Sequence, residues 1–464
     1  MPMGLNSVNR TAVTKPDITI WVIIWLIIIF FGPYVHFGIS FRIDHLLLPI
    51  LFLASLYIYV KKGKFVFLPV YMIPLLLFLI IVTCATLATL KTGEYPFHLS
   101  FGLGDFENHL RIVMYGFIFW IVSRFYEIRL QTILLFTFWM GVILSLFGIL
   151  QTITTGISVV DQFIWDLSLM LYEGQHIREK GAVELCLRIR AMSTFYTPGN
   201  FGLFLGLVCC FYCFYTELFS MRKFYNIAGF FILVTAGIFT ISKVFLGFYL
   251  LVLAGMLWRK AYLKCLVLLL IFVISFLIVG KFNPYATHVY KINIKSVLKP
   301  VMLYNTWLGS RFGKIPEVQE TKSEWTDLPA IVTGKTELDT SRIGTGYLDD
   351  YPRIIENHPI IGVGYVLVKS GDSMLNHLVV RGGGLGALCF LLFLFFLSRR
   401  LFSVIQQAEH RNSLRNAFTI CFAGFLIGGV AFPTFIQDRS TDAFWIVSFI
   451  VSNRESLKSD KYSR

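Results

Sequence analysis

Three segments of the sequence combine charged side chains with turn-forming residues, a combination that suits the binding of an anion or the transfer of a proton. The first runs from residue 188 to 202 and reads RIRAMSTFYTPGNFG. Arg190 precedes a Thr-Pro-Gly-Asn turn that opens an apolar run, and we expect Asn200 to cap the start of a helix there. An arginine beside a helix N-terminus makes an anion site. The alternative is an interfacial arginine that binds loop carbonyls.

The second segment holds two arginines ahead of a glycine turn. Arg342 lies in the sequence SRIGTG, and Arg353 precedes the turn PIIGVG at 359–364. The spacing of aromatic and aliphatic residues predicts a short helix between 347 and 357. Both arginines are candidates for binding an anion. For Arg353, an ion pair with Asp349 or Asp350, four and three residues earlier, is the interpretation we favour.

The third segment places Asp372 and Ser373 directly before an apolar run with glycines at 382, 383, 384 and 386. An aspartate at such a position can serve as a general base. Either residue can instead be the N-cap of the following helix. The glycines would let neighbouring helices approach closely.

The composition indicates what kind of protein must position these segments. Of the 464 residues, 56% are apolar, 16% aromatic and only 15% charged, whereas soluble domains are about 45–50% apolar and about 25% charged. This excludes a soluble, disordered or disulfide-rich secreted protein and favours an all-α polytopic membrane protein. The cysteines lie mostly in apolar runs and give no metal or redox signal. We therefore treat the whole chain, 1–464, as one integral membrane domain.

Runs of roughly 20 apolar residues predict membrane-spanning helices. Twelve candidates are found, at 18–40, 45–60, 65–90, 110–127, 131–158, 198–220, 224–241, 243–258, 262–280, 376–398, 416–433 and 441–453. With the N-terminus in the cytoplasm, the short inside loops carry fourteen Lys and Arg residues and the short outside loops four. This asymmetry satisfies the positive-inside rule and places both termini in the cytoplasm. It also accounts for most of the net charge of +14, so no nucleic-acid partner is expected.

Two loops on the outer side are longer than a minimal bundle needs. One spans 159–197, and the other spans 281–375, between the ninth and tenth helices. Long loops in compact proteins are usually functional or disordered. The second is rich in aromatic residues, so we expect short helices that lie over the outer mouth of the bundle. No internal repeat is found, so an inverted-repeat transporter has no support from the sequence.

Taken in order, the three segments resemble the superfamily of O-antigen ligases and Wzy-type polymerases, enzymes of bacterial glycan assembly. The first matches its Arg-x-x-Gly-x-Phe…Pro-Asn pattern from Arg190 to Asn200, with Ser193 where glycine is usual. Arg342 lies 17 residues before the turn at 359–364, as in the second pattern. Asp372-Ser373-x9-Gly-x2-Gly has the spacing of the third. The turn FRID at 41–44 and the helix end GILQ at 148–151 also resemble the family.

One departure from the family pattern bears on the reaction. The ligases carry histidine at the position of Asp372, and that histidine is regarded as catalytic. Aspartate is more typical of the polymerases, so the resemblance favours a polymerase and leaves His377 as an alternative base.

The resemblance implies a glycosyltransferase of the GT-C type in the bacterial inner membrane, with its active site on the periplasmic face. Donor and acceptor would be glycans linked to undecaprenyl diphosphate, and a chain-length regulator is a possible protein partner besides membrane lipids. Arg190 and Arg342 would stabilise the departing diphosphate, and Asp372 would take the proton of the acceptor hydroxyl. The remaining implied substrate-binding residues are Arg188, Asn200, Arg311, Arg353, Ser373 and His377. No Asp-x-Asp motif is present, so we expect an inverting transfer without a metal or other cofactor.

Two alternatives stay open. An O-antigen ligase would transfer the finished glycan to the lipid A core. A flippase or transporter of lipid-linked oligosaccharide would also be basic and polytopic, but it should place charges within its helices rather than in outer loops.

Overall fold

The computed structural model describes residues 15–32, 34–36, 40–62, 67–95, 99–153, 158–172, 190–195, 197–215, 223–283, 354, 356–366, 374–407, 411–429, 434–436 and 439–453. Its helices are α1 (Thr19–Phe31), α2 (Ile43–Lys62), α3 (Met72–Thr92), α4 (Leu99–Phe125), α5 (Leu130–Thr152), α6 (Ser158–Tyr172), α8 (Pro198–Phe214), α9 (Phe224–Phe239), α10 (Lys243–Trp258), α11 (Tyr262–Phe282), α14 (Met374–Ile405), α15 (Arg411–Gly428) and α16 (Asp442–Asn453). A short hairpin pairs β1 (Tyr34–His36) with β2 (Ser40–Arg42), and Thr434–Ile436 form one turn of 3-10 helix.

The chain carries the helices of a multi-pass membrane protein. Within the described residues, α2, α3, α5, α11 and α14 are long and apolar enough to cross a membrane. Their exposed faces are apolar as well, for example Ile50 on α2 and Leu266 on α11. Large aliphatic side chains at such positions suit contact with lipid.

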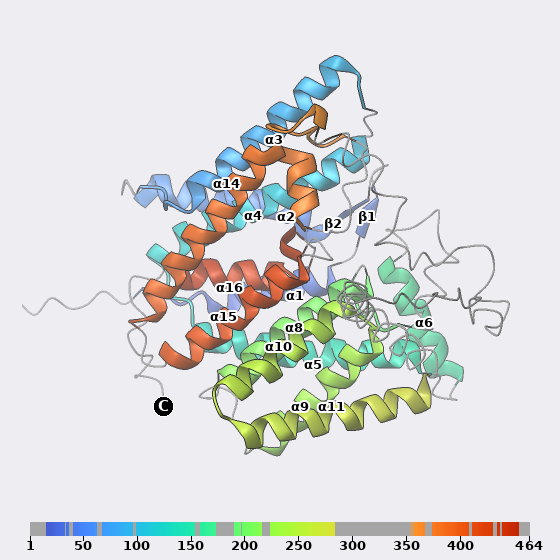
Figure 1. The fold of residues 1–464 in the computed structure, drawn as a ribbon. Helices are drawn as coiled ribbons and strands as arrows, with labels where there is room; N and C mark the ends of the chain where they lie inside the picture. Colours follow the sequence, from blue (N-terminus) through green and yellow to red (C-terminus); the bar gives the residue numbers. More distant parts are fainter. Residues whose placement is uncertain are drawn as a thin grey trace, which may run out of the picture.

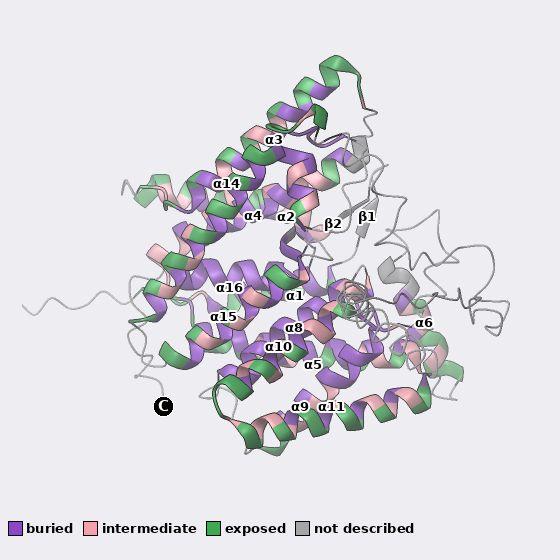
Figure 2. Cartoon of the chain, viewed as in Figure 1, coloured by how far each residue is buried: buried purple, intermediate pink, exposed green. Residues whose placement is uncertain are grey.

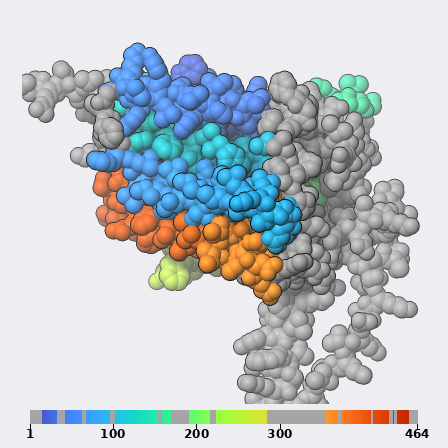
Figure 3. Space-filling model, turned by 90° about the horizontal axis from the view of Figure 1, so that it is seen from above, coloured from blue at the N-terminus to red at the C-terminus, as the bar shows by residue number. Residues whose placement is uncertain are grey.

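The helices form two groups that meet along α1 and α16 (Figure 1). One group contains α2, α3, α4 and α14; α3 lies along α14, as the blue and orange surfaces of Figure 3 show. The other contains α5, α8, α9, α10, α11 and α15, with α8 packed against α10 and α15. Nearly every residue of α8 and α16 is buried (Figure 2). Because they are apolar on all sides, both form the interior of the bundle.

One end of the bundle collects the segments of interest. Hydrogen bonds and ion pairs there join the ends of α1 and α5 and the turn between α9 and α10 to the starts of α2, α8 and α16. The first part of α4 and of α14 belongs to the same end through a further ion pair. We call it the site end. It corresponds to the outer side expected from the sequence.

Each of the twelve predicted ranges contains a helix, but several boundaries were wrong. The first range extends to residue 40, whereas α1 ends at Phe31, where the N–H of Gly32 donates to Ile28 O at 2.7 Å and the hairpin begins. The range 110–127 starts too late, because α4 already begins at Leu99. Its first turns carry polar residues that find partners inside the protein, so they resemble a loop in the sequence. The first part of the predicted loop 159–197 is helical, because α6 spans Ser158–Tyr172.

Candidate functional site

The buried charged side chains of the described residues gather towards the site end. The arginines and aspartates among them are each at most 2% exposed: Arg42, Asp44, Arg111, Arg381, Arg439 and Asp442. Removing an unpaired charge from water costs several kcal/mol. Each of these side chains is accordingly held by an opposite charge or by backbone carbonyls.

Asp442, the first residue of α16, is the centre of one group. Its Oδ1 lies 2.9 Å from Arg111 Nε, and its Oδ2 lies 3.7 Å from Arg42 Nη2. Arg42 also grips Asp44 with two donors, Nε to Oδ1 at 2.8 Å and Nη2 to Oδ2. Such a fork-to-carboxylate pair is among the stronger hydrogen-bonded contacts in proteins. The starts of α2 and α16 are thereby fixed against α4.

His45 and Glu107 extend this group towards its more accessible side. His45 Nδ1 lies 3.2 Å from Glu107 Oε2, and His45 Nε2 lies 3.4 Å from Arg111 Nη1. Glu107 is about one quarter exposed, unlike Arg111 one turn later on α4. We call Arg42, Asp44, His45, Glu107, Arg111 and Asp442 together the Asp442 cluster.

Arg439 joins the Asp442 cluster to the first of the three segments. Its backbone N–H donates to Asp442 Oδ2 at 3.2 Å. Its guanidinium donates to Phe30 O at 3.3 Å and Gly32 O at 2.9 Å, and also to Thr194 O. The last carbonyls of a helix lack partners within the helix. Arg439 therefore caps the end of α1 and holds residue 194 beside the cluster.

Arg190 is half-buried and binds the turn between α9 and α10. Its Nε donates to Thr240 O at 2.9 Å and its Nη2 to Ile241 O at 3.1 Å. The N–H of Ala191 adds a bond to Phe239 O at 3.0 Å. These contacts fix the direction of the guanidinium. They also match the alternative interpretation of this residue, an arginine that binds loop carbonyls.

The segment after Arg190 is anchored by the end of α5. Gln151 Oε1 accepts from Ser193 N at 2.8 Å, and its Nε2 donates to Ser193 O at 3.0 Å. Pro198 is the first residue of α8, and Thr197 is its N-cap, accepting from Asn200 N at 3.1 Å. The expectation that Asn200 caps this helix was wrong, because proline fixes the start of the helix two residues earlier. Asn200 lies buried in the first turn instead.

Backbone strain is concentrated around this segment. Among the described non-glycine residues, φ is positive at Ser193 (55°), Ile241 (52°), Lys260 (58°) and Arg439 (55°). All but Lys260 lie at the site end and take part in the contacts just described. A β-branched residue such as Ile241 rarely adopts this conformation. Strained residues cluster at functional sites more than elsewhere.

The second and third segments pack directly on one another. The backbone N–H groups of Val363 and Gly364 donate to Val380 O and Arg381 O at 2.9 and 3.0 Å. Those of Gly384 and Leu385 donate to Pro359 O and Ile360 O at 2.8 and 3.1 Å. The glycine turn therefore lies along the beginning of α14 as an added backbone layer.

The glycines of both segments permit this contact. α14 is broken at Gly383, whose φ of 63° and ψ of −169° are not helical. A Cβ there would lie 2.3 Å from the carbonyl of Ile360, and one at Gly362 would lie 2.5 Å from Gly383 N. Gly382 and Gly386 face Phe78 of α3 at more ordinary distances. The glycines at the start of α14 thus allow the glycine turn to pack on one side of this helix and α3 on the other.

His377 lies in the first turn of α14 and is buried. Its ring stacks on that of His109, with centroids 5.5 Å apart. His109 Nδ1 donates to Asp105 O at 2.8 Å, and the Tyr365 ring lies 5.7 Å from the His109 ring. Burial, together with the nearby Asp105 carboxylate, raises the pKa of Tyr365 well above its usual value, so the phenol stays neutral.

The remaining predicted site residues lie outside the described part of the chain: Arg188, Arg311, Arg342, Arg353, Asp372 and Ser373. Of the others, Arg190 and Asn200 share one segment, and His377 of α14 stacks on His109 of α4. Sequence reasoning missed Asp105, Glu107, His109 and Arg111 altogether. Their signal was the i, i+4 spacing of Asp105 with His109 and of Glu107 with Arg111, which is typical of a helix.

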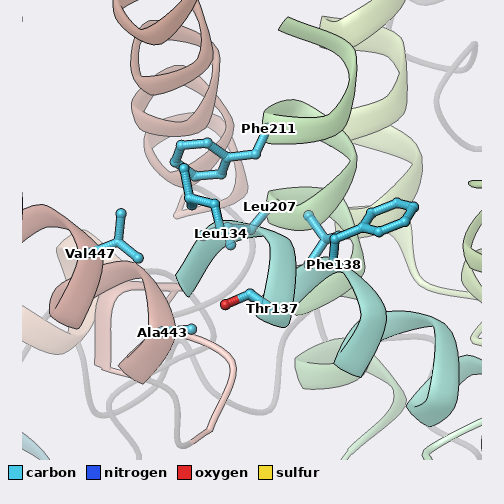
Figure 4. A pocket seen from close by; sticks show the side chains of 8 residues that line it. Leu134, Thr137, Phe138, Leu207, Phe211, Ala443 and Val447 are labelled. Carbon is cyan, nitrogen blue, oxygen red and sulfur yellow. The ribbon is translucent and has the colours of Figure 1, made fainter. Parts of the chain in front are cut away.

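A cavity between α5, α8 and α16 lies apart from these residues (Figure 4). Its lining is almost entirely apolar: Leu134, Thr137, Phe138, Leu207, Val208, Phe211, Ala443 and Val447. The hydroxyl of Thr137 already donates to Ile133 O at 2.8 Å. The volume of about 10 Å³ is at the lower limit of about 10–15 Å³ for a single water. We interpret it as a packing gap.

No protein-family model, curated protein or solved structure matches the chain. Function is therefore inferred from the chain's own residues and their geometry.

Proposed function

We propose that the chain is a membrane glycosyltransferase that polymerises undecaprenyl-diphosphate-linked repeat units into O-antigen or a related surface polysaccharide. In this proposal the fold is of the GT-C type with twelve membrane crossings. The chain lies in a bacterial inner membrane, both termini are cytoplasmic, and the site end faces the periplasm.

The observation that carries the proposal is the gathering of arginines at one end of the membrane helices. Arg190 is half-buried at the start of the segment 190–195, and the buried Arg439 and Arg42 hold that segment and the adjoining Asp442 cluster in place. A diphosphate on a polyprenyl lipid sits at the membrane surface, at the depth of helix ends. Guanidinium groups are well suited to bind it because their planar forks match phosphate oxygens.

The proposed reaction is a single displacement at the anomeric carbon of the donor sugar. The bond from that carbon to the diphosphate oxygen breaks as the bond to the acceptor oxygen forms. Attack from the face opposite the diphosphate inverts the anomeric configuration. The negative charge that develops on the leaving diphosphate would be stabilised by Arg190 and Arg342.

The acceptor hydroxyl must lose its proton as it attacks. We assign this proton to the carboxylate of Asp372, which would act as the general base. His377 is less suited to the role than the sequence suggested, because it is about 5% exposed and stacked on His109.

The distribution of buried charge favours this enzyme over a transporter. A transport path should place ionisable residues near the bilayer midplane. In the described residues several buried charged side chains do lie on helices, but they are held in paired clusters towards the site end.

The proposal is tested with purified chain in lipid nanodiscs, supplied with an undecaprenyl-diphosphate-linked repeat unit. Products are separated on gels and weighed by mass spectrometry. A ladder of longer lipid-linked glycans without another acceptor supports polymerisation. Transfer only after addition of a lipid A core acceptor would make the chain a ligase. Movement of the intact lipid across vesicle membranes without any ladder would contradict an enzyme and support transport.

A further inference from the structure

A pair of arginines lies at the end of the helices opposite the site end. Arg124 lies in the last turn of α4, and Arg400 lies near the end of α14. Each follows one partner of the Asp105–Arg381 ion pair by nineteen residues along its own helix. A helix rises about 1.5 Å per residue, so both arginines lie about 28 Å from the level of that ion pair. This distance is close to the thickness of about 30 Å of the hydrocarbon core of a bilayer.

The two arginines approach the same point between α3, α4, α14 and α16. Tyr71, the residue that precedes α3, is 2% exposed, and its hydroxyl donates to Asn453 Oδ1 at the end of α16 at 2.7 Å. Arg400 donates from Nε to Ser452 O at 3.0 Å. Arg400 and Arg124 both lie near enough to Tyr71 to act electrostatically on its hydroxyl. Two helices thus each bring a guanidinium group to one polar junction.

The protein itself leaves these positive charges without an acidic partner. Among the described residues, the half-buried Arg124 makes no hydrogen bond or ion pair, and the exposed Arg400 donates only from Nε. No aspartate or glutamate occurs in α3, in α14 or in α4 after residue 107. Glu127 follows α4 by two residues, but within the described part of the chain no ion pair joins it to either arginine. An anion from outside the protein can therefore bind here.

The end of α2 shows that this junction lies at the level of a membrane surface. Lys61 Nζ lies 5.7 Å from the centre of the Tyr57 ring. The ring of Tyr59 lies 5.6 Å from that of Trp120, one turn before Arg124 on α4. Lysine, tyrosine and tryptophan are typical of the interface between lipid and water. The phosphates of the surrounding lipids lie at this depth.

We propose that Arg124 and Arg400 bind the phosphate of an anionic phospholipid, phosphatidylglycerol. Guanidinium forks match phosphate oxygens, and basic pockets between transmembrane helices bind anionic headgroups. The acyl chains would lie on the apolar side chains next to the junction, where Ile73 of α3 is 48% exposed and Phe395 of α14 is 57% exposed. The bound lipid would join α4 to α14 at this surface. The inference depends on the chain lying in a membrane and is independent of the reaction proposed above.

The first test measures lipid binding by the purified full chain in dodecyl maltoside. Native mass spectrometry counts the bound lipids, and melting curves record the stabilisation. We expect phosphatidylglycerol to stay bound and to raise the melting temperature, whereas phosphatidylcholine, whose headgroup has no net charge, should do neither. In Arg124→Gln/Arg400→Gln the affinity for phosphatidylglycerol should fall about 30-fold.

The matched control removes two arginines from the other group of helices. Arg259 ends α10 and Arg415 lies on α15, and both are exposed. Arg259→Gln/Arg415→Gln changes the net charge by the same amount as the site variant does. Its affinity for phosphatidylglycerol should stay within about twofold of wild type, because a long-range attraction between exposed charges is screened by salt.

A single substitution separates lipid binding from a structural role of the arginines. Arg400→Gln also removes the hydrogen bond to Ser452 O, so it should lower the melting temperature of the lipid-free protein too. Arg124→Gln removes no hydrogen bond or ion pair to a described residue. We therefore expect Arg124→Gln to melt like wild type without lipid and to bind phosphatidylglycerol about fivefold more weakly.

Three results would overturn the proposed lipid site. The first is equal affinity for phosphatidylglycerol in wild type and in both glutamine variants. The second is equal binding of phosphatidylcholine, which would mean that the acyl chains alone hold the lipid. The third is equal stabilisation by glycerol 3-phosphate, a soluble phosphate without acyl chains, which would indicate a site for a free anion.

Discussion

Replacing Gly383 by alanine should detach the glycine turn from α14. The backbone of Gly383, with φ of 63° and ψ of −169°, lies in a region that only glycine commonly adopts, and other residues pay about 1–3 kcal/mol there. The added Cβ would also lie 2.3 Å from Ile360 C and O, which are backbone atoms and cannot rotate away. The turn must therefore shift or α14 must straighten.

The expected destabilisation by Gly383→Ala can be estimated from the hydrogen bonds that would be lost. The turn and α14 share backbone hydrogen bonds at Val363, Gly364, Gly384 and Leu385, each worth about 0.5–1.5 kcal/mol net. Losing two of them in addition to the strain predicts a destabilisation of about 3 kcal/mol. Hydrogen exchange followed by mass spectrometry reads out these amides directly, and thermal melting in detergent reads out the whole fold.

Gly386→Ala is the control within the same patch. Its Cβ would meet Phe78 at 3.6 Å, an ordinary contact distance, so we expect a change below about 1 kcal/mol. The reasoning is refuted if Gly386→Ala weakens the fold as much as Gly383→Ala does. That result would mean that the patch serves helix packing alone. Unchanged exchange at residues 363 and 364 in Gly383→Ala would refute it as well.

Three further predictions concern the contacts that hold the site end together. Asp442→Asn removes the nearer of the two carboxylates of the buried Arg111 and leaves only Glu107, 3.8 Å away. We expect the free energy of unfolding to fall by about 3–5 kcal/mol in thermal or denaturant unfolding, and an unchanged melting temperature would contradict a buried ion pair. Gln151→Ala removes both bonds to Ser193, so hydrogen exchange at that amide should speed up about tenfold or more, and equal exchange would show that the segment is anchored elsewhere. Burial alone would raise the pKa of Asp17. The hydrogen bonds from Thr19 and the guanidinium of Arg129 outweigh burial and lower this pKa below 3.8. Its stabilisation is thus present above about pH 4 and lost as the pH falls through the folded-state pKa. The melting difference between wild type and Asp17→Asn should therefore close at acid pH, and a difference that grew on acidification would contradict the sign.

The presence of the helices could be predicted from the sequence, because the length and apolar composition of each run are enough to indicate a helix. All twelve predicted ranges contain a helix. The start of α4 was predicted wrongly for a physical reason. Asp105 and Glu107 are charged, so without knowledge of their partners they indicate a loop rather than a buried helix. Those partners include Arg381 from the far end of the chain. A single sequence does not reveal such long-range pairing.

The contacts made by the described parts of the three segments could not be predicted from the sequence. The spacing of the glycines suggested close helix packing, whereas Gly362 and Gly383 admit a loop against a helix. Arg190 was chosen as an anion ligand, and the structure adds that carbonyls of the α9–α10 turn hold it. Every residue has a backbone carbonyl, so the residue types in the sequence do not indicate which carbonyls will bind Arg190.

The most direct measurement is the elongation of an undecaprenyl-diphosphate-linked repeat unit by wild type and by Arg190→Ala, Arg342→Ala and Asp372→Asn. Arg259→Ala, an exposed arginine at the other end of the bundle, serves as the matched control. We predict a glycan ladder with wild type and the control, and its loss in the three site variants while their melting temperatures stay close to that of wild type. Ladders of equal length and rate in the folded site variants, or no ladder with wild type, would contradict the account.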